Sequence, residues 1–493
     1  MHCDNAYLVI NPRAGQDMTK LTDVFTIFSA AGWDVDNALV EYGGHARTLS
    51  AKAAKRGYDL IIAHGGDGTT NEAVNAILQS KEPKSIVGVL PGGTANQWPH
   101  EISMPVDLAK AALTLINSDM RRVDVGCLSV QNITFPTTEQ DDQTVQKQGK
   151  GKKRKKSDKV KHYFLLTAGL GVDASVISHT SKSLKEHIGS LAFDVAAVKE
   201  LPEQHPFSIK ICEISDEQSP KTLWQGEALQ IVLGNTRLYG DTVDLMPNAY
   251  VDDGLLDICI ITANSPFTKL QQMASLVLRH KPDNTTTTYV QGAHFTITLP
   301  ATVGLQLDGS AVELADCLND ADRETLKKVK DTAKVMVTYR VDVLQQALQV
   351  AIPRTYDNTL FAHAPHMDTE HYTETQQPAT SDSTKPNAEA EQQHITQEQS
   401  NTILERAEKV TVFAVTPNPD KQNTFIVAGS IQKKKTGDVK SVALRVNTDT
   451  HIYQKTGERM ATSRIEELQE GMVIGVEGKE SKRGVIQATC IVL

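Results

Sequence analysis

A single carboxylate lies among three glycines in the stretch GGDGTT, residues 65–70 of the chain. The stretch follows an apolar run and precedes a helical pattern, so Asp67 is expected in a tight turn at a helix N-terminus. Glycine allows the backbone to approach a ligand, and the free N–H groups of a helix N-terminus attract phosphate. A carboxylate there would repel phosphate unless Mg²⁺ lay between them or the carboxylate oriented a neighbouring group. The pattern therefore indicates a site for a metal-bound nucleotide.

Two further glycine stretches follow predicted strands in the same part of the chain. NPRAG occupies residues 11–15, and LPGGTANQW occupies residues 90–98. In a parallel sheet the carboxyl ends of the strands lie at one edge, where such folds bind ligands. A ligand-free turn between strand and helix would explain one glycine cluster, but the convergence of three clusters favours a shared phosphate site.

These loops need a scaffold, and the elements around them predict one. Short apolar strands alternate with helical stretches between residues 6 and 125, a pattern typical of parallel βαβ units. We therefore expect a nucleotide-binding α/β domain with a parallel, Rossmann-like sheet at residues 1–122. Residues 123–354 are β-rich, with strands such as HFTITLP whose apolar residues alternate with polar ones. They predict an antiparallel β-sandwich that forms the other wall of a substrate cleft.

The rest of the chain divides into a polar segment and a third folded part. Residues 355–404 contain few apolar side chains and predict a disordered linker. About six short strand patterns separated by turn residues follow at residues 405–493. So few strands avoid open edges by closing on themselves, so a small β-barrel, closed or half-closed and OB-like, is expected there. No motif in this barrel indicates a role.

The glycine stretches, in this order and spacing, resemble the diacylglycerol kinase catalytic domain family, which includes the sphingosine kinases and bacterial lipid kinases. AGLGVDA at 168–174, GNTRLYGDTVDLMPNAYVDDGLLDI at 234–258 and LQLDGS at 305–310 are similar to later blocks of that family. The resemblance extends from residue 6 to about residue 352. GGDG alone is less specific, because NAD kinases and phosphofructokinases carry similar turns.

The resemblance implies an ATP- and Mg²⁺-dependent kinase whose acceptor is a lipid hydroxyl, on diacylglycerol, a sphingoid base or a related alcohol. It implies that Asp308, in LDGS, is the base for the acceptor hydroxyl, with Asp67 as the second catalytic carboxylate. The implied nucleotide- and phosphate-binding residues are Asn11, Arg13, Gly65, Gly66, Asp67, Gly68, Thr69, Glu72, Gly92, Gly93, Thr94 and Asn96. Glu72 has a second explanation, because Thr69 and Glu72 have the spacing of a helix capping box.

The DDGLLD stretch leaves two interpretations open. By resemblance, Asp252, Asp253 and the carbonyl of Leu255 form an accessory Mg²⁺ site, and carboxylates beside a tight turn suit a hard cation. An Asp-Gly hairpin turn explains the same residues. The chain also departs from the family at two positions, with Ser310 where Glu is usual and Gln97 where an acidic residue is usual.

Composition and targeting signals predict a soluble cytoplasmic protein. The formal net charge of −9 argues against a surface dedicated to nucleic acid, and no apolar run approaches the ~20 residues of a membrane-spanning helix. Residues 1–10 lack a signal-peptide pattern, and the six cysteines are scattered, as expected for reduced thiols. The sequence leaves oligomeric state open, with a homodimer as one option.

A polybasic insertion at about residues 135–161 interrupts the β-rich region. Its segment 147–161 carries nine basic residues and one acidic residue. A solvated hairpin tip explains the segment, and so does contact with anionic lipid head groups at the inner face of a membrane. A lipid kinase must reach a substrate in the bilayer, which favours the second interpretation.

Three functions therefore remain as hypotheses. The first is a lipid kinase, and the second is a kinase for a soluble acceptor such as NAD. The third is a catalytically weak lipid- or nucleotide-binding regulator, suggested by Ser310 and the extra barrel. Acceptor identity depends on pocket shape, which the sequence does not display.

Overall fold

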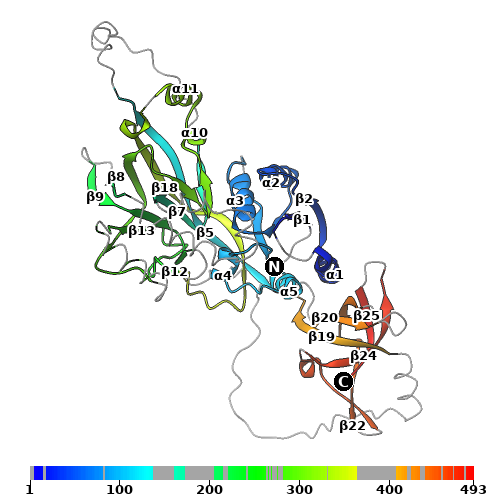
Figure 1. The fold of residues 1–493 in the computed structure, drawn as a ribbon. Coiled ribbons are helices and arrows are strands. Elements are labelled where there is room, and N and C mark those ends of the chain that lie inside the picture. The colour runs from blue at the N-terminus through cyan, green and yellow to red at the C-terminus, as the bar shows by residue number, and fades with distance from the viewer. Residues whose placement is uncertain are drawn as a thin grey trace, which may run out of the picture.

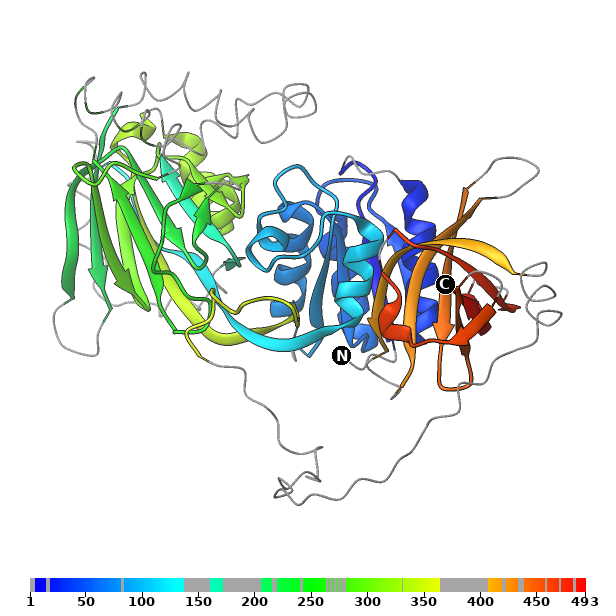
Figure 2. The same ribbon diagram turned by 90° about the horizontal axis from the view of Figure 1, so that it is seen from below.

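The computed structural model has three folded parts (Figure 1), which Figure 2 shows in a row with the α/β domain between the sandwich and the barrel. The residues described are 5–14, 18–80, 84–136, 160–171, 205–214, 220–239, 243–262, 265, 268, 272, 275, 281–329, 331–363, 407–418, 423–432, 439–456, 459–469, 471–481 and 485–493. Most of the polybasic insertion, residues 364–406 and most of residues 269–280 lie outside them.

The N-terminal part is the predicted α/β domain with a parallel sheet. Its strands, in spatial order, are β2 (Asp34–Leu39), β1 (Asn5–Ile10), β3 (Leu60–Gly65) and β4 (Ile86–Pro91). Its helices are η1 (Met18–Lys20), α1 (Leu21–Ala31), α2 (His45–Arg56), α3 (Asp67–Leu78), α4 (Gln97–Glu101) and α5 (Leu108–Ile116). β3 and β4 are buried along their whole length, which explains their continuous apolar sequence.

The second part is the predicted antiparallel sandwich. One sheet of the sandwich contains β5 (Ser118–Thr134), β6 (His162–Phe164), β8 (Phe207–Glu213), β9 (Lys221–Ala228), β15 (His294–Pro300) and β18 (Met336–Pro353). The other sheet contains, in order, β14 (Thr287–Gly292), β13 (Leu256–Ile261), β10 (Gln230–Gly234), β7 (Thr167–Gly171), β16 (Leu305–Leu307) and β17 (Ser310–Val312). Small additions are β11 (Leu238–Tyr239), β12 (Val243–Asp244), α10 (Leu314–Cys317), α11 (Asp320–Lys328) and η4 (Thr332–Lys334). Apolar side chains from both faces form one core.

Two long strands join the first two parts. β5 and β18 pair antiparallel over most of their length, and β18 also pairs in parallel with β4, where Val350 lies opposite Val87. One continuous sheet therefore runs from β2 to β9. The predicted boundary between residues 122 and 123 falls inside β5, because local composition does not reveal a strand that passes through both domains.

The predicted linker begins too early. Tyr356, Leu360 and Phe361 are buried in the core of the first domain, and the Arg121 guanidinium stacks on the Phe361 ring at 3.9 Å. Three apolar residues in a polar stretch form no periodic pattern, yet they cover an apolar surface of the α/β domain. Residues 355–363 therefore belong to the folded part.

The C-terminal part is the predicted barrel, closed by five strands. They are β19 (Glu408–Pro417), β20 (Phe425–Gln432), β21 (Val439–Val446), β24 (Val473–Glu480) and β25 (Val485–Val492). Pairing of β21 with β25 closes the ring. β22 (His451–Thr456) and β23 (Arg459–Thr462) extend the sheet, and η5 (Ile465–Glu467) follows.

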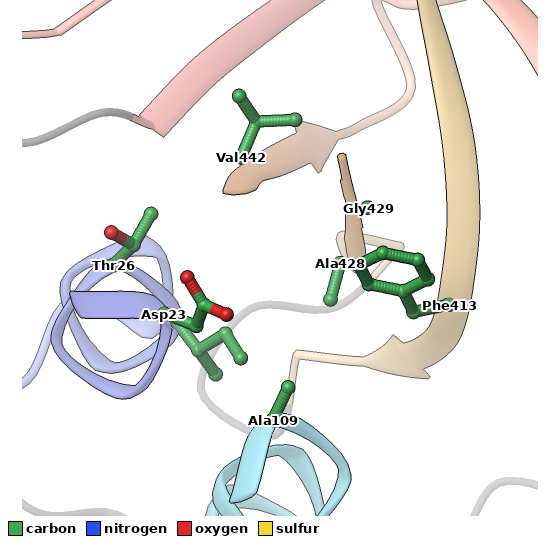
Figure 3. A pocket seen from close by; sticks show the side chains of 8 residues that line it. Asp23, Thr26, Ala109, Phe413, Ala428, Gly429 and Val442 are labelled. Carbon is green, nitrogen blue, oxygen red and sulfur yellow. The ribbon is translucent and has the colours of Figure 1, made fainter. Parts of the chain in front are cut away.

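The barrel packs against α1 and α5. Ile426, Ala428, Ala443 and Val485 belong to the core of the α/β domain rather than to the barrel's own core. The Arg445 guanidinium donates from Nε to the Ala30 carbonyl at 3.0 Å, near the C-terminal end of α1. Figure 3 shows the small cavity between the two parts, lined by Asp23, Thr26, Ile27, Ala109, Phe413, Ala428, Gly429 and Val442.

Two general expectations can be compared with the described residues. Their five cysteines are free and buried, as expected for reduced thiols. Within the same residues, no helix has the length and apolar character needed to span a bilayer.

Candidate active site

The loops after β3 and β4 are in direct backbone contact. A Cβ atom added at Gly93 would lie 2.4 Å from the Gly66 Cα, and one at Gly92 would lie 3.0 Å from the Gly65 Cα. Both distances are too short for any side chain. The glycines at these strand ends are therefore required by the contact between the two loops, and they leave backbone N–H groups near the N-terminus of α3.

Side-chain hydrogen bonds of two asparagines and of Asp67 hold the three loops together. Asn11 Nδ2 donates to Thr69 Oγ1 at 3.0 Å, which joins the NPRAG loop to α3. Asn96, at φ +50°, accepts from the N–H groups of Gly92 and Gly93 at 3.2 and 2.8 Å. The Trp98 N–H donates to Asp67 Oδ1 at 3.3 Å, so the GGDG turn is tied to the next loop. The predicted site residues of the first domain are thus largely in one place.

Two of the predicted nucleotide-binding residues are exposed. Arg13 is exposed, and its Nη2 donates to the Glu41 carbonyl at 2.6 Å. Thr94 is exposed in the loop after β4. Gly15 of the NPRAG stretch lies outside the described residues.

The predicted capping box is wrong. α3 begins at Asp67 with Gly66 as its N-cap, and no side chain caps it. The Glu72 carboxylate instead accepts from the N–H groups of Gly44 and Arg47, at 3.0 and 3.1 Å, at the N-terminus of α2. Residues three apart can form a capping box only when the first is the N-cap, whereas Thr69 lies inside the helix.

Asp308 lies in the tight turn between β16 and β17, at φ +46°, and is only 4% exposed. Its carboxylate accepts from the backbone N–H groups of Leu165, Leu166 and Thr167, at 2.9 to 3.0 Å. It also accepts from Asn71 Nδ2, on α3, at 2.7 Å. Burial raises the pKa of Asp308 to about 6, although these four hydrogen bonds favour the ionised form.

The turn that carries Asp308 faces the GGDG loop. Ser310 Oγ lies 3.5 Å from the position that a Cβ atom on Gly68 would occupy, and Ser310 is exposed. Asn71 is one helical turn after Asp67, so the two predicted catalytic carboxylates flank the first turns of α3. Chain folding thus brings residues about 240 positions apart to one side of α3.

A second polar residue of α3 joins the domains. Asn75 is buried, and its side chain both accepts from the Tyr163 N–H at 3.1 Å and donates to the Tyr163 carbonyl at 2.9 Å. Sequence reasoning missed Asn71 and Asn75. The available signal was their spacing of four residues, which places two polar amides on one face of the helix.

α4 forms another connection between the two domains. Gln97 Nε2 donates to the Leu238 carbonyl at 2.6 Å, and the Leu238 N–H donates to Glu101 Oε1 at 2.7 Å. Burial raises the pKa of Glu101, against the hydrogen bond from Leu238. The sequence identified Gln97 only as a departure from the family pattern, and sequence reasoning missed Glu101.

The DDGLLD residues do not fit a bound Mg²⁺. Asp252 accepts from the N–H groups of Ala362 and His363, at 2.7 and 3.2 Å, and lies 3.9 Å from the Arg121 guanidinium. Asp253 accepts from the Leu255 N–H at 2.9 Å, as in a tight turn. Within the described part of the chain, no group of three or more His, Cys, Asp or Glu side chains is arranged to hold a metal ion. The geometry favours the turn interpretation.

Together these features define a class: a parallel α/β domain facing an antiparallel sandwich, with glycine loops beside a buried carboxylate. Residues 5–128 match the model of the diacylglycerol kinase catalytic domain, and residues 167–326 match the YegS C-terminal NAD kinase beta sandwich-like domain. The two models together cover more than half of the chain. The chain belongs to the diacylglycerol kinase catalytic domain family, a lipid kinase family.

Individual relatives support the same conclusion. A diacylglycerol kinase of Staphylococcus saprophyticus is 29% identical over 258 residues, which are 52% of this chain and 72% of that one. A diacylglycerol kinase of Bacillus subtilis is 28% identical over 308 residues, 62% of this chain and 89% of that one. A crystal structure of a candidate diacylglycerol kinase from Bacillus anthracis shares the fold, with a TM-score of 0.51 at 19% identity over 72% of this chain and 98% of that one.

Proposed function

We propose that this protein transfers the γ-phosphate of ATP to the hydroxyl group of a lipid alcohol, with diacylglycerol as the first acceptor to test. The observation that supports this most is the position of Asp308. A buried carboxylate of the sandwich contacts α3 one helical turn from the GGDG loop of the α/β domain. Phosphoryl transfer requires a phosphate cradle and a group that accepts or orients the acceptor proton, close together.

The glycine loops are suited to the triphosphate. Their backbones approach so closely that a side chain at Gly93 would collide with Gly66, and the N-terminus of α3, which no side chain caps, favours negative charge. Asp67 is the carboxylate best placed to bind the Mg²⁺ that accompanies ATP, whose chemical contribution is to neutralise the phosphate charge. The chain's own contribution is to hold and orient the phosphates.

Asp308 is proposed to accept or orient the proton of the attacking hydroxyl. With its pKa raised to about 6, the carboxylate is largely ionised at neutral pH and becomes protonated as the pH falls below about 6. The rate should therefore fall on the acid side of about pH 6, tenfold for each pH unit. Asp308→Ala should lower kcat by about 10² to 10⁴-fold.

The test combines acceptors and variants. Purified protein receives labelled ATP and Mg²⁺ with diacylglycerol micelles, sphingosine micelles or NAD, and the products are separated. Labelled lipid from the wild type but not from Asp308→Ala supports the proposal. Labelled NAD would identify a soluble-acceptor kinase, and the absence of any labelled product would favour a binding protein. Equal labelling by Asp308→Ala would refute the assigned role of Asp308.

We also propose that residues 147–161 contact anionic lipid, although all of them except residues 160 and 161 lie outside the described part of the chain. The support is the run of nine basic residues, each contributing about 1 kcal/mol near an anionic surface. Co-sedimentation with phosphatidylserine vesicles should weaken at high salt and after Lys152, Lys153, Lys155 and Lys156 are changed to Gln. Vesicles of phosphatidylcholine alone are the control, and binding that ignores both salt and charge would contradict the proposal.

A further inference from the structure

The donors to Asp308 come from two domains. Three are backbone N–H groups of residues 165–167, which lead into β7 of the sandwich. β7 pairs with β16, the strand that ends just before Asp308. The fourth is the Asn71 amide on α3, at 2.7 Å the shortest of the set. Oδ1 accepts the Leu166 and Thr167 bonds, and Oδ2 accepts the Leu165 and Asn71 bonds. Each oxygen thus has two donors.

The orientation of the Asn71 amide is determined by its partners. Nδ2 donates to Asp308 and also to the Tyr163 carbonyl at 3.0 Å, while Oδ1 accepts from Asn75 Nδ2 at 3.0 Å. Turning the amide over would place its oxygen against a carboxylate and a carbonyl, both of which are acceptors. Asn75 is held in turn by both backbone groups of Tyr163. A chain of amides therefore presents one N–H to Asp308.

We propose that Asn71 is a positioning residue for Asp308: it reaches across the domain interface, fixes the direction of Oδ2 and stabilises the ionised carboxylate in its buried site. The proposal extends the proposed function, since it names the residue on which the base would depend. The backbone of Asp308 is left-handed and lies in a tight turn. The direction of its carboxylate therefore depends on the hydrogen bonds that the carboxylate accepts.

Other ionisable groups lie on the surrounding elements, and their titration must be distinguished from the effect of Asn71 on Asp308. They are Asp67 and Glu72 on α3 and His162 and Tyr163 on β6, whereas β7, β16 and β17 carry none. Glu72 is bound to the N-terminus of α2. Comparing each Asn71 variant in wild-type and Asp308→Asn backgrounds isolates the part of any pH dependence that belongs to Asp308.

The first measurement is the pH profile of kcat/KM. Asn71→Leu keeps the branched shape of the side chain and removes the donor. The acid limb of the profile, where kcat/KM falls as the pH decreases, should therefore move from about pH 6 to higher pH, by about one pH unit. The matched control is Asn235→Ala. Asn235 is a buried amide of the second domain that donates to the carbonyls of Asp124 and Leu165, not to Asp308. The Asn235→Ala variant should have a lower melting temperature but an acid limb at the same pH as the wild type.

The second measurement does not require catalysis. The Asn71 bond favours ionised Asp308, so its loss raises the folded-state pKa further above the unfolded value. The extra destabilisation of Asn71→Leu is therefore small at about pH 5, where Asp308 is largely protonated, and full at about pH 8. In the Asp308→Asn background, Asn71→Leu should lower the melting temperature by the same amount at both pH values.

The two measurements separate the proposals. If the wild type phosphorylates nothing but the melting temperatures behave as stated, the proposed function fails and the role of Asn71 stands. If the acid limb does not move and the destabilisation by Asn71→Leu is independent of pH, the inference about Asn71 is overturned. Should Asp308→Asn not fold, the pH dependence of Asn71→Leu against Asn235→Ala decides the question.

Discussion

At the scale of single residues, glycine identity in the strand-end loops follows from distance. Gly66 and Gly93 approach so closely that a Cβ atom on Gly93 would lie 2.4 Å from the Gly66 Cα. Neither glycine has positive φ, so the requirement is steric rather than conformational. The glycines that suggested a phosphate loop are thus required for the contact between the two loops. Backbone without side chains at these positions is a consequence of that contact.

Gly93→Ala should force the two loops apart. We expect a loss of about 1–3 kcal/mol in the free energy of unfolding, as for overpacked interiors, together with weaker ATP binding. Urea unfolding and nucleotide titration measure the two effects. Gly43→Ala is the matched control, because a Cβ atom there meets nothing within 4 Å. Equal stability and affinity for the two variants would contradict the steric explanation.

At the scale of elements, α3 and α4 hold the sandwich through side chains one helical turn apart. Asn71 and Asn75 on α3 bond the β6 region, and Gln97 and Glu101 on α4 bond both backbone groups of Leu238. Each helix therefore uses a pair of polar residues at positions i and i+4 against a strand backbone. The strand partners come from separate stretches of the second domain, so the two contacts fix its orientation.

Gln97→Glu should weaken the α4 connection, although it restores the acidic residue usual in the family. A carboxylate cannot donate to the Leu238 carbonyl, which loses its 2.6 Å bond. We expect destabilisation of about 1–3 kcal/mol, measured by urea unfolding at neutral pH. Gln225→Glu, at an exposed position on β9, should change stability by less than about 0.5 kcal/mol. A Gln97→Glu variant as stable as this control would exclude the bond as a significant contributor.

At the scale of the whole molecule, the barrel is attached to the α/β domain rather than tethered beside it. Its residues Ile426 and Ala428 lie in the α/β core, and Arg445 bonds the end of α1. The α/β domain thus has the sandwich on one side and the barrel on the other (Figure 2).

Ala428→Asp should detach the barrel. Ala428 faces the small cavity that Asp23 also lines, so the variant would bury a second carboxylate there (Figure 3). We expect a larger radius of gyration in small-angle scattering and separate melting transitions for the barrel and the kinase domains. Val473→Asp, at a barrel position 60% exposed, is the control and should leave both unchanged. A single melting transition with wild-type dimensions in Ala428→Asp would contradict the attachment.

Patterns among neighbouring residues were enough to predict the folded parts of this chain. Glycine loops at strand ends, alternating strand patterns and turn-separated short strands predicted the α/β domain, the sandwich and the barrel, because each depends on neighbouring residues. The order of the glycine stretches and of LDGS was enough to indicate the family. The candidate site was therefore visible as a set of loops.

The connections between those loops depend on tertiary contacts. The bond between Asn71 and Asp308 joins residues 237 positions apart, and Glu72 caps a helix 25 to 28 residues earlier. The strand β18 enters the first domain's sheet, and the barrel rests on α1, without any local signal. A hydrogen bond between distant residues leaves no periodicity in either segment, since its partners are chosen by chain folding. The sequence thus predicted a set of candidate site residues, whereas chain folding determined which of them contact one another.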